Sequence, residues 1–231
     1  MVDKAEAKKY VAERIGDEYI IPTLGVWERF DDIDFDALPD RFVLKCTHDS
    51  GGLMICRDKA SLDKQKVKEK IERSLRANYF WSTREWPYKD VKPRIIAEQY
   101  VEEQGQLHLP VYKFLCFNGA PKIVQTIQND KQPNETIDYF DTDWNVLELK
   151  QNFPNSAVPL PRPAQLENML EVAAALSKGH SFLRIDLYLV KNTIYFSEIT
   201  FYSDTGMRKF IPTMWDRTFG DWITLPTDKQ D

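Results

Sequence analysis

The sequence predicts an α+β fold with mostly antiparallel sheets, and three observations support this fold class. Strand-like runs are more numerous than helical ones along the chain. The strand-like runs also follow one another through short turns, as in consecutive hairpins. The length of 231 residues, with 42% hydrophobic and 29% charged residues, is typical of a globular protein. It is enough for one large domain or two small lobes.

The first third of the chain alternates helices and strands. Residues 3–16 are predicted to form a helix that ends at a glycine. "RFVLKC" (41–46) and "GLMIC" (52–56) are predicted strands on either side of the polar turn "THDSGG". A second helix is predicted over 61–78, because apolar residues recur there every four positions among lysines and glutamates. These apolar residues are Val67, Ile71 and Leu75.

The rest of the chain is richer in strands. The segment "YFWSTREWPY" (79–88) is predicted to be an aromatic loop. A proline-rich connector, "FPNSAVPLPRP", precedes a helix predicted over 164–178, and "MWDRTFGDWITLP" predicts a short closing helix. The predicted strands before the connector are residues 94–101, 111–117, 121–127 and 136–140.

Charge and composition limit the classes of function. The net charge of −5 does not favour nucleic-acid binding. No 18-residue window is apolar throughout, and the charged N-terminal segment lacks the apolar run of a signal peptide. Cys46, Cys56 and Cys116 are scattered in apolar strands and are expected to be buried thiols. We therefore expect a cytoplasmic protein without a membrane span.

The hairpin "FLRIDLYLVKNTIYFSEIT" places two carboxylates in apolar strands. Side chains alternate between the two faces of a strand, so the turn decides which residues face each other. A two-residue turn at Lys191 and Asn192 would put Asp186 opposite Ser197. A three-residue loop that includes Thr193 would put it opposite Glu198. We expect the three-residue loop, because asparagine tolerates the left-handed conformation that such a loop needs.

Two directly opposed carboxylates repel each other at a Cβ separation of about 4.5–5.5 Å. A divalent cation would offset this repulsion, because Mg²⁺ prefers hard oxygen ligands. We then expect removal of either acid to leave the metal-free fold unchanged or more stable. The alternative is a diagonal salt bridge between Arg184 and Glu198, with Asp186 exposed at a strand end.

Two lysines lie within other apolar strands. Lys45 is part of "FVLKC" and Lys113 is part of "VYKFLCF". A lysine in such a strand needs an anionic partner or must extend its ammonium to solvent at the sheet edge. Together with the turn at Gly51 and Gly52, whose backbone N–H groups can surround phosphate oxygens, the lysines favour a polyphosphate ligand.

The order of these motifs resembles the ATP-grasp fold, and within it the TupA-like family of cell-surface polysaccharide biosynthesis. The resemblance extends from Asp3 to Pro226 and is carried by "IIPTLGVW", "FVLKCTHDSGG", "REWPY", "KPRIIAEQYVEE", "YKFLCFNG", "RIDLY" and "IYFSEITF". It implies two lobes with largely antiparallel sheets and ATP bound between them. It also implies a reduced N-terminal region with a helix and a lead-in strand (1–40), a small lobe with the glycine-rich loop (41–100) and a C-terminal lobe with the metal-binding hairpin (101–231).

The resemblance implies roles for individual residues. Lys45 and Lys113 would contact ATP phosphates, and the loop from His48 to Gly52 would close over them. Glu98 would accept a hydrogen bond from the adenine amino group, with the backbone of the next residues against the ring. Glu102 or Glu103 would bind the ribose. The implied cofactor-binding residues are Lys45, His48, Ser50, Gly51, Gly52, Glu98, Gln99, Tyr100, Val101 and Lys113.

The implied metal ligands for Mg²⁺ are Asp186, Glu198 and Thr200. Thr200 departs from the family pattern, which has asparagine at this position. Arg184 and Lys113 are the implied catalytic residues, with Arg184 stabilising charge on the transferring phosphoryl group. The implied activity is ADP-forming carboxylate–amine ligation through an acylphosphate. The substrate would be a small molecule or a polysaccharide precursor, such as a sugar acid joined to an amino acid or another amine.

Two other functions stay open at this point. A glycosyltransferase would need an acidic metal motif, and Asp141-Thr142-Asp143 has the required form. A non-catalytic nucleotide-binding subunit would explain Thr200 and the short N-terminal region. The aromatic loop 79–88 is expected to pack at a lobe interface, with sugar stacking as the alternative.

Overall fold

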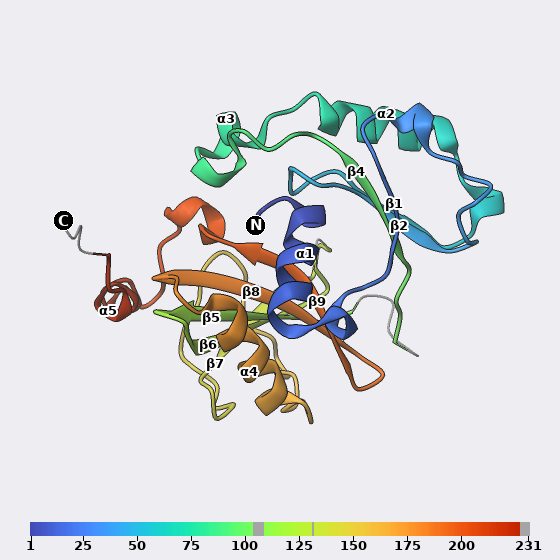
Figure 1. Cartoon of the computed structure of the whole chain (residues 1–231). Coiled ribbons are helices and arrows are strands. Elements are labelled where there is room, and N and C mark those ends of the chain that lie inside the picture. Colours follow the sequence, from blue (N-terminus) through green and yellow to red (C-terminus); the bar gives the residue numbers. More distant parts are fainter. Residues whose placement is uncertain (104–108, 131, 227–231) are drawn as a thin grey trace. The chain divides into compact units, whose positions relative to one another are not determined.

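A computed structural model describes residues 1–103, 109–130 and 132–226. The chain divides into two compact units (Figure 1). The first comprises Met1–Ala12 and Ile20–Val101, and the second comprises Glu13–Tyr19 and Glu102–Asp231. Each unit contains one antiparallel sheet with helices, so the α+β fold class is confirmed. The three-part division at residues 40 and 100 stays a prediction.

The first unit is built on a four-stranded sheet with the order β1-β4-β2-β3. Helix α1 (Lys4–Ile15) begins in this unit, which also contains α2 (Lys64–Leu75), α3 (Tyr79–Thr83) and three short 3₁₀ helices. The strands are β1 (Thr23–Trp27), β2 (Phe42–Cys46), β3 (Leu53–Cys56) and β4 (Ile95–Gln99). The 3₁₀ helices are η2 (Phe30–Asp32), η3 (Lys59–Ser61) and η4 (Trp86–Tyr88).

Helix α2 covers one face of this sheet. The helix begins after Asp63, whose carboxylate accepts a hydrogen bond from the Lys66 N–H at 3.1 Å. Val67 and Ile71 are buried against the apolar face, and each such burial stabilises the fold by about 1.5–3 kcal/mol. The strand residues of this core are Phe42, Leu44, Cys46, Cys56, Ile95 and Ala97. Because side chains alternate, the intervening residues of β2 and β4 point to the opposite face.

The second unit is built on a five-stranded sheet with the order β7-β6-β5-β8-β9. Its helices are η1 (Asp17–Tyr19), α4 (Leu166–Ser177), η5 (Ser203–Gly206) and α5 (Met214–Trp222). The strands are β5 (Val111–Phe117), β6 (Ala120–Gln128), β7 (Thr136–Phe140), β8 (Phe182–Val190) and β9 (Thr193–Thr200).

Helices cover this sheet on both faces. The buried side of α4 packs on the face that carries Cys116, whose thiol lies 3.8 Å from the Ala173 carbonyl. Phe219 of α5 joins the apolar cluster on the other face, together with Leu115 and Ile123. The same face as Leu115 and Ile123 also carries a row of polar side chains.

The predicted helices and strands are present, and the segment predicted as an aromatic loop also contains helical turns. Residues 79–83 form helix α3, where the sequence predicted loop. Its N-terminus is capped by the Asn78 side chain, which accepts a hydrogen bond from the Phe80 N–H at 3.0 Å. The three cysteines are free and buried, as predicted. Among the described residues, no helix has the length and apolar character needed to cross a membrane.

Candidate functional site

The β8–β9 hairpin brings Asp186 and Glu198 directly opposite each other. The predicted pairing is therefore confirmed, but the predicted three-residue loop is wrong. The turn consists of two residues, Lys191 and Asn192, with φ of 49° and 64°, and it joins the paired residues Val190 and Thr193. Further along the hairpin, Ser197 is an extra residue in a β-bulge, which restores the register that the short turn would otherwise shift by one.

The two acids belong to a polar row that crosses the whole sheet of the second unit. Directly opposed residues of antiparallel strands point to the same face. Lys113 of β5 is opposite both Gln125 of β6 and Asp186 of β8, and Gln125 is opposite Tyr139 of β7. Each of the five strands thus contributes one polar side chain to the row.

Arg184 is the main partner of Asp186. Its Nε and Nη2 atoms donate to the two Asp186 oxygens at 2.8 and 2.9 Å, and Nη1 donates to Ser203 Oγ at 3.0 Å. Lys113 Nζ lies 3.6 Å from the same carboxylate. Both Arg184 and Asp186 are buried. The alternative of an Arg184–Glu198 salt bridge with an exposed Asp186 is therefore wrong.

The charges of this cluster are strongly coupled. Burial alone would lower the pKa of Arg184, but the Asp186 carboxylate beside it, with Glu198 and Asp204 further away, raises that pKa above its ordinary value. Arg184 is thus held as a cation in a buried position. Asp204 and its neighbour Thr205 have left-handed backbone conformations, with φ of 48° and 61°.

The oxygen atoms of the two opposed carboxylates, Asp186 and Glu198, are suitable ligands for Mg²⁺. Two opposed carboxylates are a common protein contribution, because Mg²⁺ usually keeps phosphate and water ligands as well. Thr200 is opposite Arg184, one pair further along the same face, and is buried. In the part of the chain that the structure describes, no group of three or more His, Cys, Asp or Glu side chains could hold a metal ion. The fit rests on Asp186 and Glu198.

The glycine-containing turn of the first unit lies between β2 and β3 and packs against the end of α2. His48 Nε2 lies 3.1 Å from the Ser74 carbonyl and 3.2 Å from the Ala77 carbonyl, so the ring is directed toward the helix. The Asp49 carboxylate accepts hydrogen bonds from the Gly52 N–H at 3.1 Å and from the Ser74 hydroxyl. These contacts fix the base of the turn.

Ser50 and Gly51 form the exposed tip of this turn. Gly52 has no room for a side chain, because a Cβ atom there would lie 2.6 Å from both Cys46 Sγ and Ser74 Oγ. Gly51 has open space around it, because a Cβ atom at this position would have no neighbour within 4 Å. The tip residues can therefore approach a ligand, whereas His48 and Gly52 shape the turn.

Glu98 is buried on the face of the first sheet opposite α2. Its Oε2 atom lies 2.6 Å from Lys45 Nζ, and its Oε1 atom lies 2.5 Å from Lys8 Nζ of helix α1. Burial would raise the pKa of Glu98, but the two ammonium groups outweigh it and lower the pKa to about 2. The sequence predicted both Lys45 and Glu98 as site residues, and the structure joins them through a salt bridge.

The residues after Glu98 were predicted to form a hinge against adenine, and this role stays a prediction. The Gln99 N–H donates to the Pro22 carbonyl at 2.9 Å, which continues the β1–β4 pairing. The Arg41 guanidinium lies over the Tyr100 ring, 4.6 Å from its centroid. Val101 is partly buried. In the second unit, the Glu103 carboxylate accepts a hydrogen bond from the Lys191 N–H of the hairpin turn.

Several polar residues of these clusters were missed from the sequence, among them Lys8, Gln125 and Ser203. In the sequence Lys8 is not distinguished from the other two lysines of α1, because its partner Glu98 is 90 positions away. Gln125 belongs to the polar row, and its signal was available: it is a polar residue inside the apolar run "KIVQTI". Ser203 follows β9 in an irregular segment, where periodicity gives no information about direction.

Asp141 does not have the geometry expected of a metal motif. Its Oδ1 atom accepts hydrogen bonds from the N–H groups of Asp143 at 3.0 Å and Asn145 at 2.8 Å. Asn145 also donates to Oδ2 through its side chain at 2.8 Å. Burial would raise the pKa of Asp141, but these hydrogen bonds lower it. Asp141 therefore stabilises a turn, which removes the main support for a glycosyltransferase.

The aromatic segment is divided between buried and exposed rings. Phe80 and Tyr88 are buried, whereas Trp81 and Trp86 are each 63% exposed. Arg84 lies 5.2 Å from the centroid of the Trp81 ring, and Lys89 lies 4.4 Å from that of Trp86. Packing at a lobe interface stays a prediction, and the exposed indole rings leave sugar stacking open.

Comparison with known proteins agrees with these features. A family model described as TupA-like ATP-grasp matches residues 1–224. The chain belongs to the TupA-like ATP-grasp family. No curated protein matches it.

Solved structures similar to this TupA-like ATP-grasp chain are ligases of the same fold. The D-alanine–D-alanine ligase from Coxiella burnetii has 12% sequence identity and a TM-score of 0.52, over 96% of this chain and 56% of the ligase. VanG D-Ala:D-Ser ligase from Enterococcus faecalis has 14% identity and a TM-score of 0.51, over 86% of this chain and 52% of the ligase. This chain thus spans about half the length of these ligases, and the likeness shows the ATP-grasp fold.

Proposed function

We propose that this TupA-like ATP-grasp protein is an ATP-dependent carboxylate–amine ligase. A substrate carboxylate attacks the γ-phosphate of ATP, and the bond to the ADP leaving group breaks to give an acylphosphate. An amine then attacks the acyl carbon, phosphate leaves, and an amide forms. Catalysis of this kind needs no protein nucleophile, because positioning and electrostatic stabilisation lower the barrier.

One observation carries this proposal. Asp186 and Glu198 face each other from neighbouring strands, with Arg184 and Lys113 beside Asp186 on the same sheet face. Two carboxylates and two cations in one cluster match a metal–polyphosphate ligand, since the acids bind Mg²⁺ and the cations bind phosphate oxygens. A bound Mg²⁺ would neutralise charge on the phosphates. Thr200 is proposed as a further, neutral ligand.

The chain's own residues have distinct proposed roles. Lys113 and Arg184 stabilise the charge of the phosphoryl group as it transfers. Asp186 holds the Arg184 guanidinium in place through two hydrogen bonds. In the first unit, Lys45 and the backbone N–H groups of Ser50 and Gly51 bind phosphates, with His48 and Gly52 shaping the turn.

Adenine recognition is proposed for Glu98 and the hinge that follows it. The ionised Glu98 carboxylate accepts a hydrogen bond from the adenine amino group. The backbone from Gln99 to Val101 lies along the ring, and Glu102 or Glu103 binds the ribose hydroxyls. The contact of Glu103 with the Lys191 N–H favours Glu102 for this last role.

The proposed substrates are a sugar acid and an amino acid or another amine, joined in the biosynthesis of a surface polysaccharide. Membership of the TupA-like family supports the pathway. The names of the similar solved structures, ligases for D-alanine and D-serine, support an amino acid as one reactant.

A screen for ADP release tests the function. Purified protein is incubated with ATP and Mg²⁺ and with pairs of sugar acids and amino acids, and ADP is measured by a coupled assay. We expect release that depends on one pair and is lost in Asp186→Asn and Glu198→Gln. Mg²⁺-dependent ATP binding without ADP release for any pair would instead support a non-catalytic nucleotide-binding subunit.

A further inference from the structure

Lys8 is a buried lysine on helix α1 with a complete set of acceptors. Its Nζ atom lies 2.7 Å from the Ile21 carbonyl, 3.1 Å from Thr23 Oγ1 and 2.5 Å from Glu98 Oε1. An ammonium has three N–H donors, and these three acceptors match that number. The side chain is 10% exposed, so its position is fixed by the surrounding first unit.

Glu98 is shared between Lys8 and Lys45. Each carboxylate oxygen faces one ammonium, with Lys8 on Oε1 and Lys45 on Oε2. The Lys45 side chain is more exposed, at 18%. A buried carboxylate that loses all of its cations is strongly disfavoured, and Lys8 would remain on Glu98 if Lys45 moved away.

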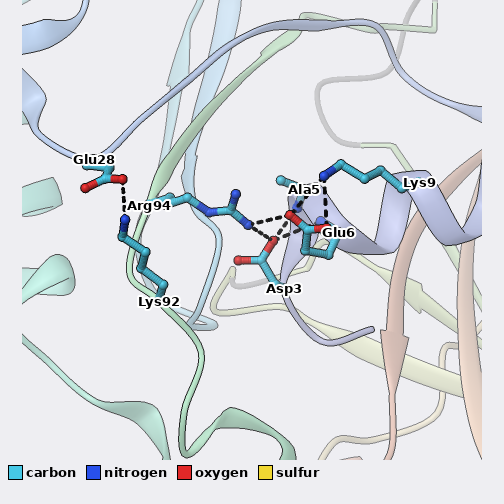
Figure 2. A network of polar contacts seen from close by, with 7 residues as sticks. All are labelled: Asp3, Ala5, Glu6, Lys9, Glu28, Lys92 and Arg94. Carbon is cyan, nitrogen blue, oxygen red and sulfur yellow. Dashed lines mark hydrogen bonds and ion pairs between the residues drawn. The ribbon is translucent and has the colours of Figure 1, made fainter.

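The start of α1 is also tied to the glycine-containing turn. The Lys4 N–H donates to the Thr47 carbonyl at 3.0 Å, and its side chain donates to the Asp49 carbonyl. Figure 2 shows the Arg94 guanidinium directed toward Asp3 and Glu6. Its Nη2 atom lies 2.9 Å from Asp3 Oδ1 and 3.0 Å from Glu6 Oε1. The helix that carries Lys8 is therefore anchored to the turn whose tip is Ser50 and Gly51.

We propose that Lys8 is a positioning residue for the nucleotide, which keeps Glu98 paired while Lys45 exchanges this carboxylate for a phosphate group. The proposal rests on the proposed function. In the nucleotide-bound state, Lys45 pairs with a phosphate oxygen, Lys8 stays on Oε1, and Oε2 accepts the adenine amino group. Without Lys8, Glu98 would retain Lys45 as its remaining cation and compete with the phosphates for it.

The exchange predicts a specific pattern in a double-mutant cycle. Lys8→Met should weaken binding of inorganic tripolyphosphate, a probe with no adenine, because Glu98 holds Lys45. In the Glu98→Gln background the same change should have no effect, since a neutral amide does not hold Lys45. A merely structural role of Lys8 would lower thermal stability in both backgrounds and leave phosphate affinity unchanged at temperatures well below melting.

The experiment is isothermal titration of ATP and tripolyphosphate, each with saturating Mg²⁺, into wild type, Lys8→Met, Glu98→Gln and the double variant. Lys9→Met is the matched control, because Lys9 lies on the same helix but is exposed and pairs with Glu6. We expect Kd for both ligands to rise about tenfold or more in Lys8→Met. The double variant should match Glu98→Gln for tripolyphosphate, and Lys9→Met should match wild type.

Two results would overturn the proposal. One is an unchanged Kd for both ligands in folded Lys8→Met, and the other is an equal loss of affinity in both backgrounds. Lys8→Gln replaces Lys8→Met if the latter does not fold, with the same expected pattern. Lys45→Met separates this inference from the proposed function: if it binds ATP as wild type does, the nucleotide site itself is wrongly assigned. If it weakens binding while Lys8→Met does not, the role of Lys8 alone is wrong.

Discussion

Asp186 and Glu198 lie directly opposite each other on β8 and β9, but their surroundings differ. Asp186 is buried and contacts Arg184 and Lys113. Glu198 is partly buried, and its charge contributes to raising the pKa of Arg184. The two acids should therefore respond differently to substitution, although both are proposed to bind the same Mg²⁺.

Asp186→Ala is expected to destabilise the ligand-free protein by about 3–5 kcal/mol, because it leaves the buried Arg184 cation without its partner. Asp186→Asn should cost less, since the amide oxygen still accepts a hydrogen bond. This revises the expectation from the sequence that removing either acid is neutral or stabilising. Urea unfolding without ATP or Mg²⁺ measures the effect, and Glu198→Gln should be nearly neutral in the same assay.

With ATP and Mg²⁺ the two variants should converge. Binding stabilises a protein by about 2.7 kcal/mol at a hundredfold excess over Kd. Wild type should therefore melt at a higher temperature with ATP and Mg²⁺, and Asp186→Asn and Glu198→Gln should lose the Mg²⁺-dependent part of this shift. If both variants retained it, the metal assignment would be refuted.

Lys45→Met and Lys113→Met are each expected to weaken ATP binding by about 1.5–3 kcal/mol, the typical contribution of a charged hydrogen bond. Titration calorimetry at constant ionic strength measures the change. Lys92→Met is a suitable control, because Lys92 is exposed and pairs with Glu28 (Figure 2). ATP affinity that stays at the wild-type value in both site variants would contradict the phosphate assignment.

Glu98→Gln should reduce the preference for ATP over GTP. The carboxylate only accepts hydrogen bonds, which suits the adenine amino group, whereas an amide can also donate to the guanine oxygen. The ratio of the two Kd values, measured on wild type and variant, reports the change. Equal affinity of the wild type for both nucleotides would show that Glu98 does not read the base.

The same residue should determine the stability of the first unit in acid. The pKa of Glu98 is lowered from 4.5 to about 2, so its contribution to stability is present above pH 4.5 and is lost as the pH falls toward 2. The depression corresponds to about 3 kcal/mol as an upper bound. Burial lowers the pKa of Lys8 despite its contact with Glu98. Keeping this ammonium charged therefore offsets part of the stability that the ionised Glu98 contributes.

Urea unfolding between pH 7 and pH 2 tests this acid dependence. Wild type should lose more free energy of unfolding below pH 4.5 than Glu98→Gln, which lacks the titrating group. Parallel pH profiles for the two proteins would contradict the assignment of the acid response to Glu98.

Trp81→Ala and Trp86→Ala should change the free energy of unfolding little, by about 0.5 kcal/mol, because both rings are mostly exposed. Phe80→Ala, in the same segment, should cost about 3–5 kcal/mol as a buried aromatic residue. Once a substrate pair is known, a raised KM with unchanged kcat in the tryptophan variants would indicate that they bind the acceptor. An unchanged KM would show that the two tryptophans do not bind the acceptor.

The fold was predictable because its elements have strong local signals. The periods of the strands and of α2, and the glycine in the β2–β3 turn, each predict the element that forms. The helix at 79–83 was missed because its aromatic residues have no helical period, and the Asn78 cap is a single-residue signal. Family resemblance supplied what periodicity does not, the order of the site residues along the chain.

The site was predictable where partners are close in sequence and less so elsewhere. The pairing of Asp186 with Glu198 was correct, but it was predicted from a three-residue loop, and the bulge at Ser197 produces the same register instead. The salt-bridge alternative named the wrong partner for Arg184. Residues i and i+2 of a strand point to the same face, so Arg184 lies beside Asp186 and pairs with it. Lys8 was missed because no periodic pattern links a helix lysine to a strand 90 residues later.

The bulge at Ser197 has a consequence for related sequences. A two-residue turn with one bulged residue and a three-residue loop without a bulge both leave a separation of twelve positions between Asp186 and Glu198 (198 − 186 = 12). An insertion at the turn can therefore be compensated by loss of the bulge, with the two acids still opposed. Homologues should preserve this separation while their turns vary in length, and a sequence alignment that places a gap at the turn alone would misalign Glu198.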